Sequence, residues 1–219
     1  VDIDPRAIGR TWPAHVRVAG AVKAVLDSLL ALEAGRASQL EATRAPRAAW
    51  VEQIRAAGPR CYDAGNTRSD AVPLHPARVV AGLRKVMPRN AALAVDSGAH
   101  RAFASHYWES YEPRSYLCAT NLGPMGWAIP AGIGAKLARP ESPLAVVTGD
   151  GCMLMHGMEI QTAARYEVPV LFVVINNGAL ANVWLRARQD GPGPMALTEL
   201  PVHDWAGFAR SLGLQAATV

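Results

Sequence analysis

Cysteine is scarce in this sequence, and its spacing narrows the class of protein. The 219 residues include three cysteines, Cys61, Cys118 and Cys152, which lie far apart and form no Cys-x-x-Cys pair. Neither a disulfide framework nor a zinc site is therefore indicated. A reducing cytoplasm is the expected location.

Long apolar runs and concentrated charge are also missing. No apolar segment reaches the roughly 18 residues that a membrane helix needs, and the opening VDIDPRAIGR has no signal-peptide pattern, so we expect no membrane association. The net charge of +4 is small, and the arginines are scattered rather than gathered around aromatic side chains, so we expect no nucleic-acid partner. Hydrophobic residues are plentiful at 50%, enough for one sizeable core or two modest domains.

From Pro76 onward, segments with helical spacing alternate with short apolar runs, a pattern typical of strands joined by helical crossovers. The expected order is helix (76–87), strand (91–98), helix (100–108), Gly/Pro-rich turn (121–130), helix (131–138), strand (143–150), helix (152–167) and strand (168–176). This alternation predicts an α/β fold with a doubly wound parallel sheet and helices on both faces.

The first sixty residues form a separate pattern. We expect strands at 1–4 and 16–19 and a helix at 21–34, as in a partial Rossmann-like α/β unit. Between Pro46 and Val72 the composition turns to Arg, Ala, Gly, Pro, Asn and Asp, which is typical of a linker. We therefore place one domain at 1–60 and a second at 61–219.

Small or polar residues follow three of the expected strands. They are Asp96-Ser97-Gly98, Gly149-Asp150-Gly151 and Asn176-Asn177-Gly178. Ligands of open parallel sheets bind outside the carboxyl ends of the strands, so this edge is the expected binding site.

Asp150 and Asn177 carry the clearest chemical signal. If their strands are neighbours, a carboxylate, an amide oxygen and a backbone carbonyl form an oxygen half-shell suited to Mg²⁺ and phosphate. Gly149 and Gly151 allow close backbone approach, and the helix that follows offers free N–H groups to an anion. The alternative is structural, because Asp often caps a helix and Asn-Gly is a common turn pair.

The chain resembles the thiamine-diphosphate-dependent enzymes, and among them the acetolactate synthase-like group. Their cofactor motif is Gly-Asp-Gly, a helix and a strand, and then Asn-Asn, which here falls at 149–151 and 176–177 with the family's spacing. NLGPMGWAIPAGIGAKLA (121–138) resembles the family's Gly-x-Met-Gly segment with its Gly-rich helix, and SGAHRAF (97–103) lies where the family has a Gly-Gln-His loop. VDIDPRAIGR, with the VRVAG that follows, is similar to the end of the family's middle domain.

The resemblance implies a cofactor, thiamine diphosphate with Mg²⁺, and a role for each matching residue. Asp150, Asn177 and the carbonyl of Ala179 would be the metal ligands. The backbone N–H groups of Gly151 and Cys152 would bind the diphosphate.

The remaining cofactor contacts implied by the resemblance lie on the other turns. The loop Gly98-Ala99-His100 would contact the other end of the diphosphate, while Gly149 lets the backbone approach it. Gly123 would accept a hydrogen bond from the aminopyrimidine, and Met125 would hold the cofactor in a V shape. That shape brings a pyrimidine nitrogen beside the thiazolium carbon that must lose a proton, so Gly123 and Met125 are the expected catalytic residues.

Two positions depart from the family pattern. Ala99 stands where acetolactate synthases carry Gln, which removes a side-chain contact. Arg186 falls about where the family's substrate-selecting Trp is expected, with Trp184 two residues earlier. Arg186 either pairs with a substrate carboxylate or is a solvated helix residue, and both interpretations remain open.

The resemblance implies part of an enzyme that decarboxylates a 2-oxo acid and ligates the resulting enamine to a second carbonyl. The alternatives are a 2-oxo acid decarboxylase or aldehyde lyase of the same family, or a non-catalytic or split-subunit cofactor-binding module. Residues 1–60 would be the tail of the central domain with its linker, and 61–219 the diphosphate- and Mg-binding domain, incomplete at its C-terminus. A partner subunit in a homodimer or homotetramer would supply the pyrimidine-binding domain, without which the fragment is expected to be inactive.

Two further polar residues lie close in sequence to the Gly-Asp-Gly motif. His156 and Glu159 follow Gly-Asp-Gly on the next helix. We expect His156 to be a partly buried helix residue and Glu159 to be structural, since the catalytic acid of the family faces the pyrimidine from another domain.

Overall fold

The computed structural model describes residues 1–58 and 63–219. The chain divides into two compact units, Val1–Arg60 and Cys61–Val219. The expected domain boundary between residues 60 and 61, and Cys61 itself, lie outside the described residues. Each unit is described by itself below.

The first unit is helical. Its helices are α1 (Val22–Ala34), α2 (Ala37–Ala42) and α3 (Arg44–Ala56). The helix expected at 21–34 is therefore confirmed. The linker expected from Pro46 is wrong up to Ala56, because its Ala, Arg, Glu and Gln residues favour helix and Pro46 lies in the first turn of α3, where no amide donor is needed.

The two strands expected in the first unit do not form. Residues 1–4 and 16–19 contribute one isolated parallel bridge, between Asp2 and Ala19. Two hydrogen bonds hold it, from Asp2 N–H to the Val18 carbonyl (3.3 Å) and from Gly20 N–H to the Asp2 carbonyl (2.9 Å). Strands need further partners and a covered apolar face to be stable, and the side chains of Ile3 and Val16 are exposed here.

The second unit contains a four-stranded sheet in the order β2-β1-β3-β4, with all pairs parallel. The strands are β1 (Ala92–Val95), β2 (Tyr116–Leu117), β3 (Leu144–Gly149) and β4 (Leu171–Ile175). Val95 pairs with Val147, and Gly149 pairs with Ile175, so β1, β3 and β4 all end near one edge. The short strand β2 was not expected from the sequence.

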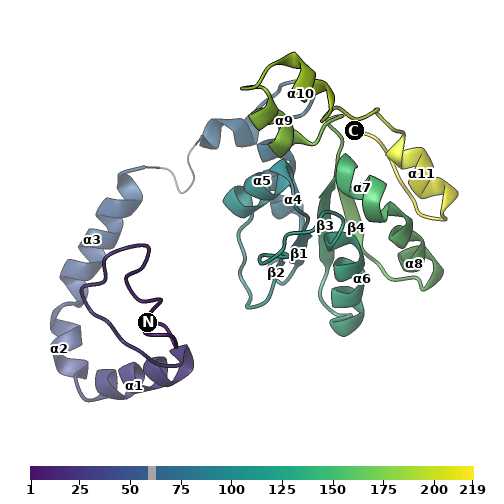
Figure 1. The fold of residues 1–219 in the computed structure, drawn as a ribbon. Coiled ribbons are helices and arrows are strands. Elements are labelled where there is room, and N and C mark those ends of the chain that lie inside the picture. Colours follow the sequence, from purple (N-terminus) through teal and green to yellow (C-terminus); the bar gives the residue numbers. More distant parts are fainter. Residues whose placement is uncertain (59–62) are drawn as a thin grey trace. The chain divides into compact units, whose positions relative to one another are not determined.

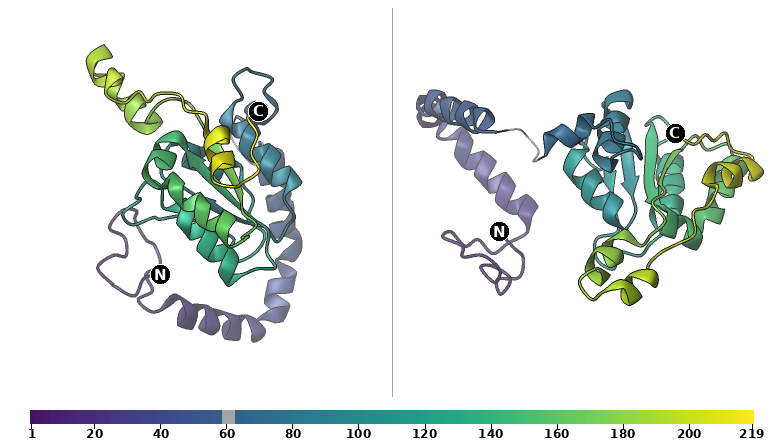
Figure 2. Two further views of the ribbon diagram at one scale, coloured as in Figure 1. Left: turned by 90° about the vertical axis from the view of Figure 1, so that its right-hand side faces the viewer. Right: turned by 90° about the horizontal axis from the view of Figure 1, so that it is seen from above.

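Helices cover both faces of this sheet (Figure 1 and Figure 2). Alternate residues of the buried strands point to opposite sides. On one side Leu93 and Val147 pack against α4 (Pro76–Val86) and α5 (Ala99–Tyr107). On the other side Ala94 and Val146 pack against residues of α6 (Ala128–Ala138), α7 (Asp150–His156) and α8 (Ile160–Arg165). The doubly wound α/β fold expected from the sequence is confirmed.

Two helices differ from their expected bounds. The helix expected at 131–138 begins three residues earlier, at Ala128, because Pro130 lies in the first turn, where its missing N–H costs nothing. The helix expected at 152–167 is divided into α7, the 3₁₀ turn η2 (Gly157–Glu159) and α8. The division occurs at the buried Gly157, which packs against Met153 and Phe208.

The remaining elements of the second unit are short and complete the surface around the sheet. They are η1 (Ala64–Arg68), α9 (Ala181–Ala187), α10 (Pro192–Ala196) and α11 (Trp205–Ser211). None of the described helices has both the length and the apolar character that crossing a membrane requires.

Candidate functional site

A cavity of about 810 Å³ lies at the carboxyl edge of the sheet, within the size range of small-molecule sites, about 300–1,000 Å³. Ten residues predicted from the sequence line it: Gly98, Ala99, His100, Met125, Gly149, Asp150, Gly151, Cys152, Asn177 and Ala179. Gly123 lines an adjoining depression that shares Ser97, Gly98 and Asn182 with the cavity. The fold thus brings together every residue that the sequence predicted for the site.

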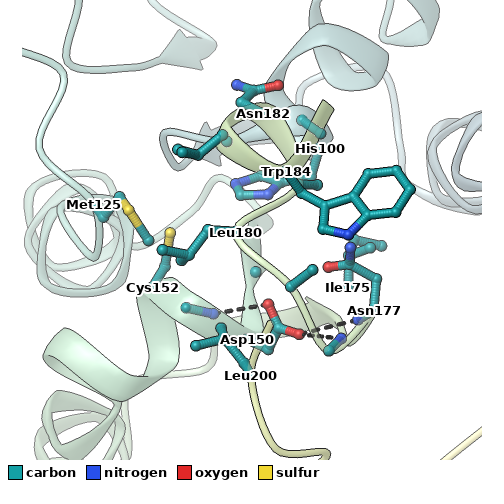
Figure 3. A pocket seen from close by; sticks show the side chains of 18 of the residues that line it. His100, Met125, Asp150, Cys152, Ile175, Asn177, Leu180, Asn182, Trp184 and Leu200 are labelled. Carbon is teal, nitrogen blue, oxygen red and sulfur yellow. Dashed lines mark hydrogen bonds between the residues drawn. The ribbon is translucent and has the colours of Figure 1, made fainter. Parts of the chain in front are cut away.

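Asp150 joins two of the turns at this edge. The residue is 2% exposed and begins α7 directly after β3. Its Oδ1 accepts a hydrogen bond from Gly151 N–H (2.8 Å), and its Oδ2 accepts from Asn177 N–H (3.1 Å) and Gly178 N–H (2.6 Å). Figure 3 shows this carboxylate between the start of α7 and the turn after β4. The carboxylate therefore fixes the spacing of the two turns.

The turn after β4 is held by a short antiparallel pairing. Ala179 pairs with Glu199, and the hydrogen bonds run from Leu180 N–H to the Thr198 carbonyl and from Leu200 N–H to the Gly178 carbonyl, both at 2.8 Å. These two bonds leave the Ala179 carbonyl outside the ladder. Gly178 has φ +65°, a left-handed conformation that glycine adopts without strain.

The chemistry of these donors fits Mg²⁺. Asp150 supplies a carboxylate, Asn177 an amide oxygen and Ala179 a carbonyl, all of them hard oxygen ligands on the wall of one cavity. Among the described residues no three His, Cys, Asp or Glu side chains gather around a common point, so no all-side-chain metal centre competes with this set. Mg²⁺ commonly takes only one or two carboxylates and fills its octahedron with water and phosphate oxygens.

His100 lines the cavity with a largely buried side chain. The residue is buried, and its Nε2 has no hydrogen-bond partner among the described residues. Burial lowers the pKa of His100 below its ordinary value, although the charges of Asp96 and Asp150 oppose this shift. The imidazole is therefore neutral near pH 7, and its ring lies so close to Gly98 and Gly149 that a Cβ at either position would fall within about 3 Å of it.

Cys152 lies on the same side of the cavity as Met125 (Figure 3). Its thiol donates a hydrogen bond to the Ser97 carbonyl at 3.3 Å. Burial, assisted by the negative charge of Asp96, raises the pKa of this thiol to about 11. Cys152 therefore stays protonated and links the 97–98 loop to the start of α7 instead of acting as a nucleophile.

The turn that carries Met125 is bounded by two left-handed glycines, Gly123 (φ +67°) and Gly126 (φ +84°). Met125 projects from this turn towards Gly151. A Cβ added at Gly151 would lie 2.9 Å from Cε of Met125 and 2.7 Å from Cδ2 of Leu180. The missing side chain at Gly151 is thus what lets these two apolar groups approach the turn after β3.

Sequence reasoning missed part of the site. It noted Asp96 only as a residue at the end of a strand, yet this carboxylate is 1% exposed and accepts three hydrogen bonds. Thr148, one of its donors, is fully buried. A polar residue inside the apolar run 144–149 was the available signal. The apolar lining from Leu180, Trp184, Leu200 and Val202 was also not predicted.

The structure places Trp184 and Arg186, the two residues near the position of the family's substrate-selecting Trp, in different surroundings. Trp184 lines the cavity beside Asn177, whereas Arg186 is exposed and is not among the cavity residues. This placement favours the solvated interpretation of Arg186. His156 is exposed rather than partly buried as expected, with its ring against Gly126, and Glu159 is exposed on η2.

Comparison with known proteins gives one family match. Residues 96–219 match the family model described as thiamine pyrophosphate enzyme, C-terminal TPP binding domain. The chain is 32% identical to the acetolactate synthase large subunit of Haemophilus influenzae, over 97% of this chain and 36% of that protein. It is 35% identical to the acetolactate synthase isozyme 3 large subunit of Escherichia coli K12, over 84% of this chain and 31% of that protein.

Solved structures that are similar in fold include one that is also similar, at a lower level, in sequence. It is the thiamine diphosphate-dependent 4-hydroxybenzoylformate decarboxylase of Rhodococcus jostii RHA1, with a TM-score of 0.61 and 25% identity over 67% of this chain and 28% of that chain. The chain spans about a third of the length of the curated relatives it matches.

Proposed function

Because the chain belongs to the thiamine pyrophosphate enzymes, through the C-terminal TPP binding domain of that family, we propose that its cavity binds the diphosphate of thiamine diphosphate through Mg²⁺. Asp150, Asn177 and the carbonyl of Ala179 are the proposed metal ligands. The observation that carries this proposal is that these three residues line one cavity, with Asp150 buried at the start of α7.

Several lining residues would take part in holding the cofactor. The N–H groups of Gly151 and Cys152 lie at the start of α7, where they would bind an anion, with the Gly151 N–H shared between that anion and Asp150 Oδ1. His100, whose buried Nε2 has no partner among the described residues, lies beside Gly149, and Ala99 leaves its loop without the side-chain contact of a Gln. Together these groups would hold the diphosphate end.

The side chains of Met125 and Leu180 give the cavity an apolar wall beside Gly151. Their side chains would support the cofactor rings, and the carbonyl of Gly123 in the adjoining depression would accept a hydrogen bond from the pyrimidine. When bound, thiamine diphosphate supplies a nucleophilic carbon and an electron sink for cleavage beside a carbonyl. The chain's own contribution is to orient those rings and to keep water from them.

We further propose that the chain is part of an acetolactate synthase-like transferase or lyase that decarboxylates a 2-oxo acid and ligates the remaining acyl fragment to a second carbonyl. The acetolactate synthase relatives support this reaction. A simple 2-oxo acid decarboxylase is the second candidate. The similarity to the decarboxylase from Rhodococcus jostii supports it.

A pyrimidine-binding domain from a partner subunit, in a homodimer or homotetramer, is part of the same proposal. Leu154, Met155 and Met158 are at least half exposed on α7 and η2, and these apolar side chains offer a surface for the partner subunit.

The free thiols of Cys118 and Cys152 are compatible with a reducing location, and the cytoplasm is the compartment we propose.

Isothermal titration of the chain with thiamine diphosphate, with and without Mg²⁺, tests the cofactor proposal. We expect heat that depends on Mg²⁺ and is lost in Asp150→Ala and Asn177→Ala. Asp204→Ala is the matched control, since that carboxylate also accepts a backbone N–H, from Gly207, but is exposed at α11. Equal binding by Asp150→Ala and the wild type would contradict the assignment of the metal ligands.

Product analysis separates the two candidate reactions. In an assembly that includes a pyrimidine-binding domain, pyruvate should give acetolactate if the second carbonyl is accepted and acetaldehyde if it is not. Turnover only after a separate pyrimidine-domain chain is added would indicate a split enzyme. Cofactor binding without turnover in such an assembly would support the non-catalytic module.

A further inference from the structure

Asp96 lies at the end of β1 and accepts hydrogen bonds from three different parts of the chain. Its Oδ1 accepts from Ser97 N–H (3.0 Å) and from Gly126 N–H (2.8 Å). Its Oδ2 accepts from the hydroxyl of Thr148 (2.9 Å). The carboxylate is 1% exposed, so water does not compete for these bonds.

The three donors lie in or next to three of the segments that line the cavity. Ser97 precedes the Gly98-Ala99-His100 loop, Gly126 directly follows Met125, and Thr148 lies two residues before Asp150. Thirty residues separate Asp96 from Gly126, and 52 separate it from Thr148. A single buried side chain therefore links segments that the sequence keeps far apart.

We propose that Asp96 is a positioning residue that sets the place of Met125 relative to the Asp150 turn. This inference rests on the proposed function, because it assigns Met125 to the ring end of the bound cofactor and Asp150 to its diphosphate end. Asp96 itself does not line the cavity and acts through the residues that do.

The geometry of the Met125 turn supports this role. Gly126 has φ +84°, so no side chain at this position restrains the backbone, while its N–H is fixed on Asp96. The Asp96 bond to Gly126 thus anchors the residue next to Met125, and the bond to Thr148 anchors the strand that leads to Asp150.

A carboxylate suits this task better than a neutral acceptor. A charged acceptor makes hydrogen bonds roughly twice as strong as a neutral one, and it can serve several donors at once. Within the described residues no ion pair involves Asp96, so the three donors are what compensates its buried charge. Removing one donor therefore weakens the whole connection.

Two conservative substitutions test the proposal. Thr148→Val keeps the shape of a buried side chain and removes one donor. Asp96→Asn keeps the size of the side chain and removes its charge. It also replaces Oδ2, which accepts the hydrogen bond from Thr148, with an NH₂ group that cannot accept one. Thr148→Ser restores the hydroxyl and should rescue the effect of losing it, while Asp204→Asn is the control for changing a carboxylate elsewhere.

The first measurement needs no cofactor. Amide hydrogen exchange is followed at Gly126 and at the β1 and β3 amides, together with the ¹³Cε methyl resonance of Met125. We expect Gly126 to exchange about tenfold faster in both variants, with a shifted or broadened Met125 resonance and unchanged strand amides. Exchange that rises equally throughout the sheet, or a Gly126 amide that does not change, would overturn the proposal.

The second measurement compares thiamine diphosphate with inorganic diphosphate, each with Mg²⁺. We expect both variants to bind inorganic diphosphate as the wild type does and to bind thiamine diphosphate about tenfold more weakly, because only the ring end depends on Met125. Equal weakening of both ligands would indicate a merely structural role and overturn the proposal. Failure of the wild type to bind either ligand would count against the proposed function, while the exchange result would still decide on Asp96.

Discussion

The Gly178 N–H donates a hydrogen bond of 2.6 Å to Oδ2 of Asp150, and so connects the turn after β4 to the turn after β3. The two residues are 28 positions apart, with α7, η2, α8 and β4 between them. The bond fixes the distance between two of the proposed metal ligands before any metal binds, because Asn177 precedes Gly178 and donates to the same oxygen.

Asp150→Ala should therefore lower stability as well as metal binding. The substitution leaves three backbone N–H groups without their acceptor, and each unsatisfied donor costs about 1–3 kcal/mol when water cannot reach it. Because Asn177 and Gly178 are not fully buried, we expect a total loss of about 1–3 kcal/mol in the free energy of unfolding, measured with urea. Asp204→Ala, which removes an exposed N-cap, should cost about 1 kcal/mol, and a larger loss there than at Asp150 would contradict this account.

Gly151→Ala should affect binding more than stability. The new Cβ would contact the ends of two flexible side chains, Leu180 and Met125, which are able to move aside. We expect the free energy of unfolding to change by less than about 1.5 kcal/mol while Mg²⁺-dependent binding of thiamine diphosphate weakens at least about tenfold. Calorimetry and urea unfolding of the same preparation separate the two effects, and unchanged affinity would argue against a ligand at this turn.

Gly132→Ala and Gly134→Ala form a matched pair within α6. A Cβ at Gly132 would collide with Cγ2 of Val146 on β3, whereas nothing lies within 4 Å of the Cβ position at Gly134. We expect Gly132→Ala to destabilise the protein by about 1–3 kcal/mol through overpacking. Gly134→Ala should stabilise it by about 0.5–1 kcal/mol through helix propensity. Equal effects of the two substitutions would mean that α6 does not pack on the sheet through Gly132.

Cys152 should resist alkylation in the folded protein. Its thiol has a pKa of about 11, so iodoacetamide at pH 8 finds almost no thiolate, while unfolding returns the pKa towards about 8.5. Peptide mapping by mass spectrometry should show Cys118, which is only half-buried, modified before Cys152.

The raised pKa of Cys152 also makes stability depend on pH: the contribution of its protonated thiol to the free energy of unfolding is lost as the pH rises from the unfolded value towards 11. Fast modification of Cys152 in the folded state would contradict its burial.

His100 should make the protein less stable in mild acid. Its pKa is lowered in the folded state. Below the unfolded value of about 6.5 the unfolded chain therefore binds the proton more readily, which stabilises the unfolded state relative to the folded one. We expect the free energy of unfolding to fall as the pH drops through this window and to fall less in His100→Gln. An NMR titration of the imidazole gives the direct check, and a pKa above 6.5 in the folded protein would contradict it.

Much of the fold was readable from local patterns. The strands β1 and β3 are mostly apolar runs buried on both faces, and β4 is an apolar run of mostly half-buried residues. Short apolar runs of this kind predict strands of a covered parallel sheet. The resemblance to thiamine-diphosphate-dependent enzymes, carried by Gly149-Asp150-Gly151 and Asn176-Asn177, is confirmed by the family match. The metal ligands and the individual cofactor contacts remain predictions.

The sequence-based predictions of secondary structure were wrong mainly in the first unit, where local propensity favoured strands that have no neighbouring strand to pair with. Val16 and its neighbours have strand propensity, but with one bridge between Asp2 and Ala19 and no further strand they form no sheet. The composition from Pro46 onward predicted a linker, yet the helix-favouring residues up to Ala56 belong to α3. Local composition alone does not reveal whether a partner segment is present.

The sequence by itself determined which chemical groups are available at each strand end. Glycine supplies a backbone that can approach a ligand closely, and aspartate and asparagine supply side-chain oxygen atoms. It also determined the parallel α/β architecture through the spacing of apolar residues. Only the tertiary structure decided that the Asp96 carboxylate joins Ser97, Gly126 and Thr148, and that Trp184 rather than Arg186 lines the cavity. These relationships depend on strand order and on the rotation of short helices, which arise from packing between distant segments and leave no periodic signal in the chain.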